Sequence, residues 1–222
     1  MKRYFPFILI AVVAMLTVGS GAMLYRAKQR AGAGVTATGG TGAPATSAMT
    51  PEHFRGESGA PVTLEEFGDF QCPACAKTAE VIRPLEKVYG GRLRIVFWQF
   101  PLPVHQHGHD AALAAEAASM QGRFWEMHDL LYQNQSSWSK EQDARPLFES
   151  YAKELHLDVE RFKKDFESQQ VAARVDRQQE HGVSRGVQNT PTLFINNQLL
   201  TPPFTPERLH EAISAAMPGR SS

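Results

Sequence analysis

The apolar and polar positions of residues 62–100 predict a strand, a helix and a second strand. Successive side chains of Val62–Phe67 would point to opposite faces of a strand. The segment Pro73–Tyr89 fits a helix that Pro84 should kink or break. Residues 92–100 are rich in β-branched and aromatic side chains, which indicates a second strand. Elements of these lengths predict a parallel, right-handed βαβ unit.

A block with only helical patterns follows. Its predicted helices repeat apolar side chains at helical spacing and cover residues 110–120, 124–132, 144–155, 159–166 and 171–181. Asp158 should cap the fourth helix, and Gly182 should end the last one. Strands return at Thr192–Ile195 and Gln198–Leu200, with Asn196-Asn197 forming a tight turn that needs positive φ. A final helix should begin at Pro206, after Thr205.

The N-terminal segment, residues 1–25, predicts export from the cytoplasm. Two basic residues precede an uncharged run whose most apolar part is Phe5–Val18. This run fits a signal peptide with a cleavage site near Ser20-Gly21-Ala22, and it also approaches the length of a transmembrane helix. We favour a retained anchor, because residues 26–52 are rich in Ala, Gly and Thr and form the flexible linker that a tethered domain needs. The predicted location is the extracytoplasmic side of the cell envelope.

The candidate chemistry lies in the two cysteines of the chain, Cys72 and Cys75, which flank Pro73-Ala74. Cys72 would lie at the N-terminus of the first helix, where unpaired N–H groups and the helix dipole stabilise a thiolate and lower its pKa. Pro73 suits the first helical turn because it has no N–H to satisfy. Cys75 lies one turn along the same face, within reach of a disulfide. We predict that Cys72 is the exposed attacking sulfur and Cys75 the shielded resolving one.

Two other uses of the cysteine pair are weaker interpretations. A tetrahedral zinc site needs four ligands, and the nearby histidines, His105, His107 and His109, do not have the spacing of a usual zinc motif. A structural disulfide would close a very short loop, and short loops stabilise least in the chain-entropy model. The sequence therefore predicts a redox-active pair with neither metal nor cofactor. The role of the three histidines stays open.

Two further positions are candidates on their residue types alone. Glu66 continues an apolar row of the first strand, so it is either a half-buried carboxylate that accepts or relays the proton of Cys75, or a strand-end residue that reaches solvent. Pro191, in Asn189-Thr190-Pro191-Thr192, reads as a strand-start proline, for which a trans peptide bond is the default. His128 reads as a surface or hydrogen-bonded histidine.

Composition and charge exclude some classes of function. The 222 residues hold 23 Lys plus Arg and 23 Asp plus Glu, and no basic patch with interleaved aromatic residues occurs. Nucleic acid is therefore not an expected partner. The length allows a single domain with an insertion, or two small domains.

The order of these elements resembles a thioredoxin fold, of class α/β, with an inserted helical domain. The sequence is similar to the DsbA family of bacterial thiol–disulfide oxidoreductases, in particular to its membrane-anchored branch. The resemblance spans about residues 55 to 217, and the segments that carry it are Pro61–Cys75, Phe100-Pro101-Leu102, Ala114–Ala118, Gly122–Trp125 and Gly186–Thr192. It implies a first thioredoxin half at 53–104, a helical insertion at 105–185 and a second half at 186–222.

The resemblance also assigns roles to individual residues. Pro191 would be cis and pack against the cysteine pair, and the Thr190 backbone would pair with an extended substrate, beside Pro73 and Ala74. Glu66 would be the buried carboxylate of the family. Well-known oxidases of the family carry a histidine where Ala74 stands here, so the resemblance implies a milder oxidant.

The expected function is an oxidase that introduces disulfides into reduced exported proteins and is reoxidised by a quinone-linked membrane partner. A reductase or an isomerase in the envelope is the alternative within the same chemistry. Isomerases of this superfamily usually carry an N-terminal dimerisation domain, and the low-complexity linker here favours a monomer. The alternative without thiol–disulfide chemistry is a non-catalytic chaperone or a metal-carrying module.

Overall fold

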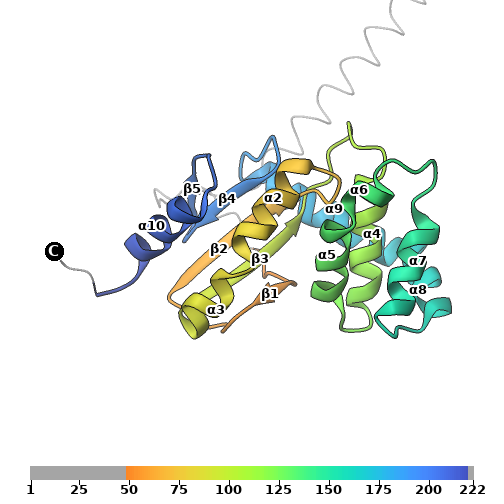
Figure 1. Ribbon diagram of the computed structural model, residues 1–222, viewed down its shortest axis with the longest axis horizontal. Coiled ribbons are helices and arrows are strands. Elements are labelled where there is room, and N and C mark those ends of the chain that lie inside the picture. The colour runs from red at the N-terminus through yellow and green to blue at the C-terminus, as the bar shows by residue number, and fades with distance from the viewer. Residues whose placement is uncertain (1–48, 220–222) are drawn as a thin grey trace, which may run out of the picture. The chain divides into compact units, whose positions relative to one another are not determined.

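The computed structural model describes residues 49–219. The predicted anchor or signal segment at 1–25, and most of the predicted linker at 26–52, lie outside this range. From Met49 onward the chain forms one compact unit around a five-stranded sheet (Figure 1). Within residues 49–219, no helix combines the length and the apolar character that crossing a bilayer requires.

The sheet has the strand order β1-β3-β2-β4-β5. Its strands are β1 (Phe54–Arg55), β2 (Val62–Gly68), β3 (Leu93–Gln99), β4 (Thr192–Ile195) and β5 (Gln198–Leu200). The central pair β2 and β3 is parallel, as the βαβ pattern predicts, and the other neighbours are antiparallel. Strand β1 was not predicted, because two residues carry no periodicity.

Helices cover both faces of the sheet. On one face, α2 (Pro73–Ile82), α3 (Leu85–Tyr89) and α10 (Pro206–Ala216) bury an apolar cluster that includes Leu64 of β2. On the other face, α9 (Gln169–Ser184) lies behind the sheet in Figure 1. The predicted break at Pro84 is confirmed, since this residue separates α2 from α3.

The helical insertion lies between β3 and β4. Its remaining helices are α4 (Gly108–Ser119), α5 (Phe124–Gln133), α6 (Gln135–Trp138), α7 (Arg145–Glu154) and α8 (Val159–Phe166). Helix α4 is central and contacts α5, α7, α8 and α9. Its buried alanines let these neighbours approach closely. The fold prediction, a thioredoxin-type sheet with a helical insertion, is confirmed.

Most local predictions agree with the structure, and one is wrong. Asn196 and Asn197 have φ values of 48° and 67°, as the turn requires, and the Asp158 side chain accepts a hydrogen bond from the backbone N–H of Arg161. Gly182 does not end α9, which continues to Ser184. A Cβ at Gly182 would lie 2.6 Å from the Phe100 ring, so this glycine lets the helix pack tightly on the sheet.

Candidate functional site

Cys72 lies where the loop after β2 enters α2. Its extended backbone, with φ −72° and ψ 119°, places it at the N-cap, and Pro73 follows in the first turn. Both cysteines are free thiols. Cys75 is fully buried, as predicted, but Cys72 is only 7% exposed and is therefore more enclosed than the prediction of an exposed sulfur.

The two sulfurs have opposite pKa shifts. A hydrogen bond from the Cys75 side chain lowers the pKa of Cys72 from 9.0 to about 5, and backbone N–H groups of Cys75 and Ala74 act in the same direction. Burial opposes these donors but does not outweigh them. Burial raises the pKa of Cys75 well above 9.0, and the neighbouring Cys72 side chain and Glu66 raise it further. Near neutral pH, the site therefore holds a thiolate at Cys72 beside a thiol at Cys75.

Glu66 is a buried carboxyl group beneath the cysteines. The side chain is 3% exposed, and its Oε1 has no hydrogen-bond partner among residues 49–219. Burial first, and the negative Cys72 second, raise the pKa of Glu66 from 4.5 to about 8. Of the two interpretations from sequence, the half-buried carboxylate is the one that agrees with this environment.

Thr190 and Pro191 face the cysteine pair from the loop before β4. The Thr190-Pro191 peptide bond is cis, as the resemblance implies. When Cys72 is protonated, its thiol donates to the Thr190 carbonyl oxygen over 3.4 Å. The Thr190 hydroxyl is buried and has no partner within the described part of the chain, so it is free to donate to Cys72, and it helps to lower the pKa of that thiol.

The loop that carries Cys72 is held by two side chains that the sequence did not single out. The carboxylate of Asp69 accepts hydrogen bonds from the backbone N–H groups of Gln71 and Leu102, at 2.8 and 2.7 Å. From α6, the Gln135 amide donates to the carbonyl oxygens of Phe70 and Cys72, at 2.6 and 2.9 Å. In the sequence, the only indication of a role for Asp69 is its polar side chain just before Cys-x-x-Cys. No sequence feature indicates the role of Gln135.

The histidines at 105–109 do not share a site. His105 Nδ1 lies 2.6 Å from the buried Asp69 carboxylate, whereas His107 Nε2 lies 2.8 Å from the Glu141 carbonyl oxygen. His105 thus supports the loop before Cys72 through Asp69.

A different cluster brings potential metal ligands together. Oxygen and nitrogen atoms of Glu52, His53 and Glu116 lie within 4.8 Å of one another. His53 Nε2 already lies 2.7 Å from Glu116, and the Arg174 guanidinium is paired with both Glu52 and Glu116. These ion pairs fit a structural network between residues 52–53 and the helical insertion better than a cation site.

The sequence of the described domain matches a known family. A family model described as thioredoxin matches residues 48–215, which is most of the chain. The chain belongs to the thioredoxin family.

This thioredoxin-family chain is similar to curated proteins of two kinds. The Na(+)/H(+) antiporter NhaA 3 of Salinispora tropica is 37% identical over 167 residues, which cover 74% of this chain and 24% of the antiporter. The chain thus spans about a quarter of the length of this relative. The probable disulfide bond formation protein D of Bacillus cereus is 32% identical over 164 residues, which cover 71% of this chain and 76% of that protein. The predicted resemblance to DsbA-type proteins is confirmed by this second relative.

Solved structures show the same fold. BdbD from Bacillus subtilis, in its oxidised form, has a TM-score of 0.67 at 24% identity and covers 75% of this chain and 92% of its own. The thiol-disulfide exchange protein alpha-DsbA2 from Wolbachia pipientis has a TM-score of 0.63 at 16% identity, covering 74% and 86%.

Proposed function

We propose that this chain is a thiol–disulfide oxidoreductase that acts as an oxidase and introduces disulfides into exported proteins through a Cys72–Cys75 disulfide. The observation that carries the proposal is the opposite pKa shift of two adjacent sulfurs, about 5 for Cys72 and well above 9.0 for Cys75. A low thiolate pKa makes Cys72 a good leaving group from a mixed disulfide, and burial keeps Cys75 from reacting with external disulfides.

The reaction begins with the disulfide form. A substrate thiolate attacks the Cys72 sulfur, the Cys72–Cys75 bond breaks, and Cys75 leaves as a thiolate that takes a proton from the Glu66 carboxyl group. A second substrate thiolate then attacks the substrate sulfur of the mixed disulfide and releases Cys72 as a stable thiolate. The two substrate sulfurs are oxidised, and the two cysteines of the enzyme are reduced.

The direction of exchange follows from the Cys72 pKa. A pKa of about 5 in place of 9.0 stabilises the reduced form at pH 7 by roughly 3 kcal/mol. For a two-electron couple, this free energy shifts the potential by roughly 60 mV in the oxidising direction. The shift supports an oxidase that is milder than the strongest members of the DsbA type, in accord with Ala74 at the position where those members carry histidine.

Substrate contact is proposed for four residues around the sulfur. Pro73 and Ala74 are exposed next to Cys72, and the Thr190-Pro191 segment precedes β4 on the opposite side of the sulfur. An extended substrate would pair with the Thr190 backbone as an added strand does. Reoxidation by a quinone-linked membrane partner, and attachment to the membrane through residues 1–25, belong to the same proposal.

The test combines a potential with a rescue assay of the full-length chain. Equilibration with glutathione should give the Cys72–Cys75 pair a reduction potential well above that of thioredoxin, which is about −270 mV, and closer to that of DsbA, which is about −120 mV. The wild-type chain should restore disulfide formation in cells that lack their envelope oxidase, and Cys72→Ala should not. Cys75→Ala is the matched variant, because it should accumulate the mixed disulfide with substrate. A potential near −270 mV would favour a reductase, and rescue by Cys72→Ala would overturn the catalytic role.

A further inference from the structure

Glu66 adjoins a small cavity that the mechanism above does not use. The cavity has a volume of about 20 Å³, and its polar lining consists of Glu66, Arg55, Arg83, His128 and Asp129. A space of this size is enough for one water molecule, which needs two to four polar partners. The unpartnered Oε1 of Glu66 therefore has polar neighbours for a bridging water.

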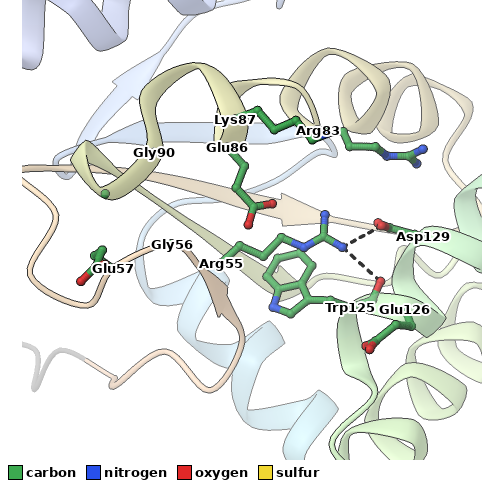
Figure 2. A pocket seen from close by; sticks show the side chains of 11 residues that line it. Arg55, Gly56, Glu57, Arg83, Glu86, Lys87, Gly90, Trp125, Glu126 and Asp129 are labelled. Atoms are coloured by element: carbon green, nitrogen blue, oxygen red, sulfur yellow. Dashed lines mark hydrogen bonds and ion pairs between the residues drawn. The ribbon is translucent and has the colours of Figure 1, made fainter.

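The cavity adjoins an open groove on the surface. Arg55, Arg83, Trp125 and Asp129 line both the cavity and the groove, whose volume is about 810 Å³. Figure 2 shows the Arg55 side chain reaching across the groove to Asp129. Its Nη2 lies 2.7 Å from the Asp129 carboxylate, and its guanidinium lies 4.4 Å from the centre of the Trp125 ring.

His128 and Asp129 form a hydrogen-bonded pair on the α5 side of this cavity. His128 Nδ1 lies 2.9 Å from the Asp129 carboxylate, which holds the proton on Nδ1 and leaves Nε2 as the acceptor nitrogen. The ring is 6% exposed and is packed against the rings of Phe70, Phe97, Phe124, Trp125 and Tyr132. Burial lowers the pKa of His128 below 6.5, so the ring is neutral at pH 7 and can accept a proton.

We propose that the His128–Asp129 pair and the cavity beside Glu66 form the route by which the proton of Cys75 leaves the buried site and returns to it. This inference rests on the proposed function and extends it. During reoxidation, the Glu66 carboxyl group first loses its own proton, which a water in the cavity carries to His128 Nε2 and the groove beside Arg55 delivers to solvent. The Glu66 carboxylate then takes the proton of the Cys75 thiol, whose sulfur reacts as a thiolate. During oxidation of a substrate the proton moves the opposite way and reprotonates Glu66. His128 acts as a proton carrier that Asp129 positions.

Several other charged or titratable groups surround Glu66, and they would shape the pH dependence of this route. They are Cys72 at the N-cap of α2, Cys75 of α2, Arg83 just beyond α2, Arg55 of β1, and Tyr132 of α5, in addition to the His128–Asp129 pair.

The test separates two steps of the reaction between the reduced full-length protein and oxidised glutathione. In the first step, the Cys72 thiolate forms a mixed disulfide, which requires no proton from Cys75. In the second, Cys75 must lose its proton to displace the glutathione thiolate. His128→Phe preserves the ring packing and removes both nitrogens. It should leave the first step unchanged and slow the second by about tenfold at pH 6–7. Rapid acid quench and mass spectrometry measure both steps.

His181→Phe is the matched control. His181 also packs between aromatic rings, 4.6 Å from Trp98 and 5.8 Å from Phe67, but on the opposite face of the sheet. Both steps should keep their wild-type rates in this variant. Asp129→Asn is the second variant on the route, and it should slow the second step less than His128→Phe does.

The outcomes distinguish this inference from the proposed function. If the wild-type protein exchanges disulfides normally and the second step is unchanged in both His128→Phe and Asp129→Asn, the proton route is wrong and the oxidoreductase stands. Equal slowing of the two steps also overturns the route, because it indicates a structural role for His128. If the wild-type protein forms no mixed disulfide at all, the proposed function itself fails.

Discussion

Replacing Glu66 with glutamine should make the reduced protein more stable at neutral pH. Glu66 is buried at the centre of the sheet, and its pKa of about 8 lies well above the ordinary 4.5. Between these pH values the unfolded chain releases a proton that the folded protein retains, so stability falls as pH rises from 4.5 to 8. Glutamine has nearly the same shape and does not ionise, and this loss should disappear in the variant.

The size of the stability change follows from the difference between pH 7 and the ordinary pKa of the carboxyl group. At about 1.4 kcal/mol for each pH unit, the ionisable group destabilises the fold by about 3 kcal/mol at pH 7. Glu66→Gln should therefore raise the unfolding free energy by about that amount, which corresponds to roughly 6–12 °C in Tm for a domain of this size. Below pH 4.5 the two proteins should be equally stable, because both side chains are then neutral in both states.

The assay is urea unfolding of the full-length protein under reducing conditions, from pH 4 to pH 8. Glu65→Gln is the control from the same strand. Glu65 points to the other face, where its carboxylate accepts hydrogen bonds from Trp98 Nε1 at 2.9 Å and from Arg185 at 2.8 Å. Removing that charge should destabilise the protein by about 1–3 kcal/mol.

Two results would refute the reasoning about Glu66. One is a loss of stability in Glu66→Gln at pH 7, which would mean that the carboxylate has partners that the structure does not show. The other is a gain that stays the same at pH 4 and pH 7, since only an ionisation in this range produces the predicted slope.

Three other changes probe the site and its support. Cys75→Ala removes the thiol that donates to Cys72, so the pH at which Cys72 alkylation reaches half its maximal rate should rise above the wild-type midpoint, which is expected near pH 5. Equal midpoints in the two proteins would contradict the hydrogen bond from Cys75. Thr190→Val should move the wild-type midpoint upward by roughly one unit, because it removes a donor to the thiolate; Thr192→Val, whose hydroxyl bonds to Asn189 instead, is the control and should leave it unchanged. Gly182→Ala should destabilise the protein by about 1–3 kcal/mol in thermal unfolding, because its Cβ would press on the Phe100 ring; an unchanged Tm would show that the ring can move away.

The parts of the fold that the sequence predicted are those set by local patterns. The strand before Cys72, the helix break at Pro84, the cap at Asp158 and the turn at Asn196-Asn197 each depend on a few neighbouring residues. The position of Cys72 at the start of α2 is of the same kind, since a strand, a cysteine and a proline in this order specify it.

The parts that could not be predicted depend on contacts between distant residues. Gln135 reaches a carbonyl group 65 residues away, and Arg55 reaches Asp129 across 74 residues. Gly182 looked like a helix end because its packing against Phe100 is invisible in the sequence. His128 read as an ordinary surface or hydrogen-bonded histidine because the cavity it lines is formed by five separate segments of the chain.

The contact that Gln135 makes with the loop before α2 has a practical consequence for protein engineering. A minimal redox scaffold cut from this chain by excising the insertion would lose the Gln135 amide. Among residues 49–219, this amide is the only hydrogen-bond donor to the Cys72 carbonyl oxygen from outside α2. The shortened protein could keep its sheet, but the turn that carries Cys72 would lack this hydrogen bond. Any shortened version should therefore be designed with a substitute amide in place of α6.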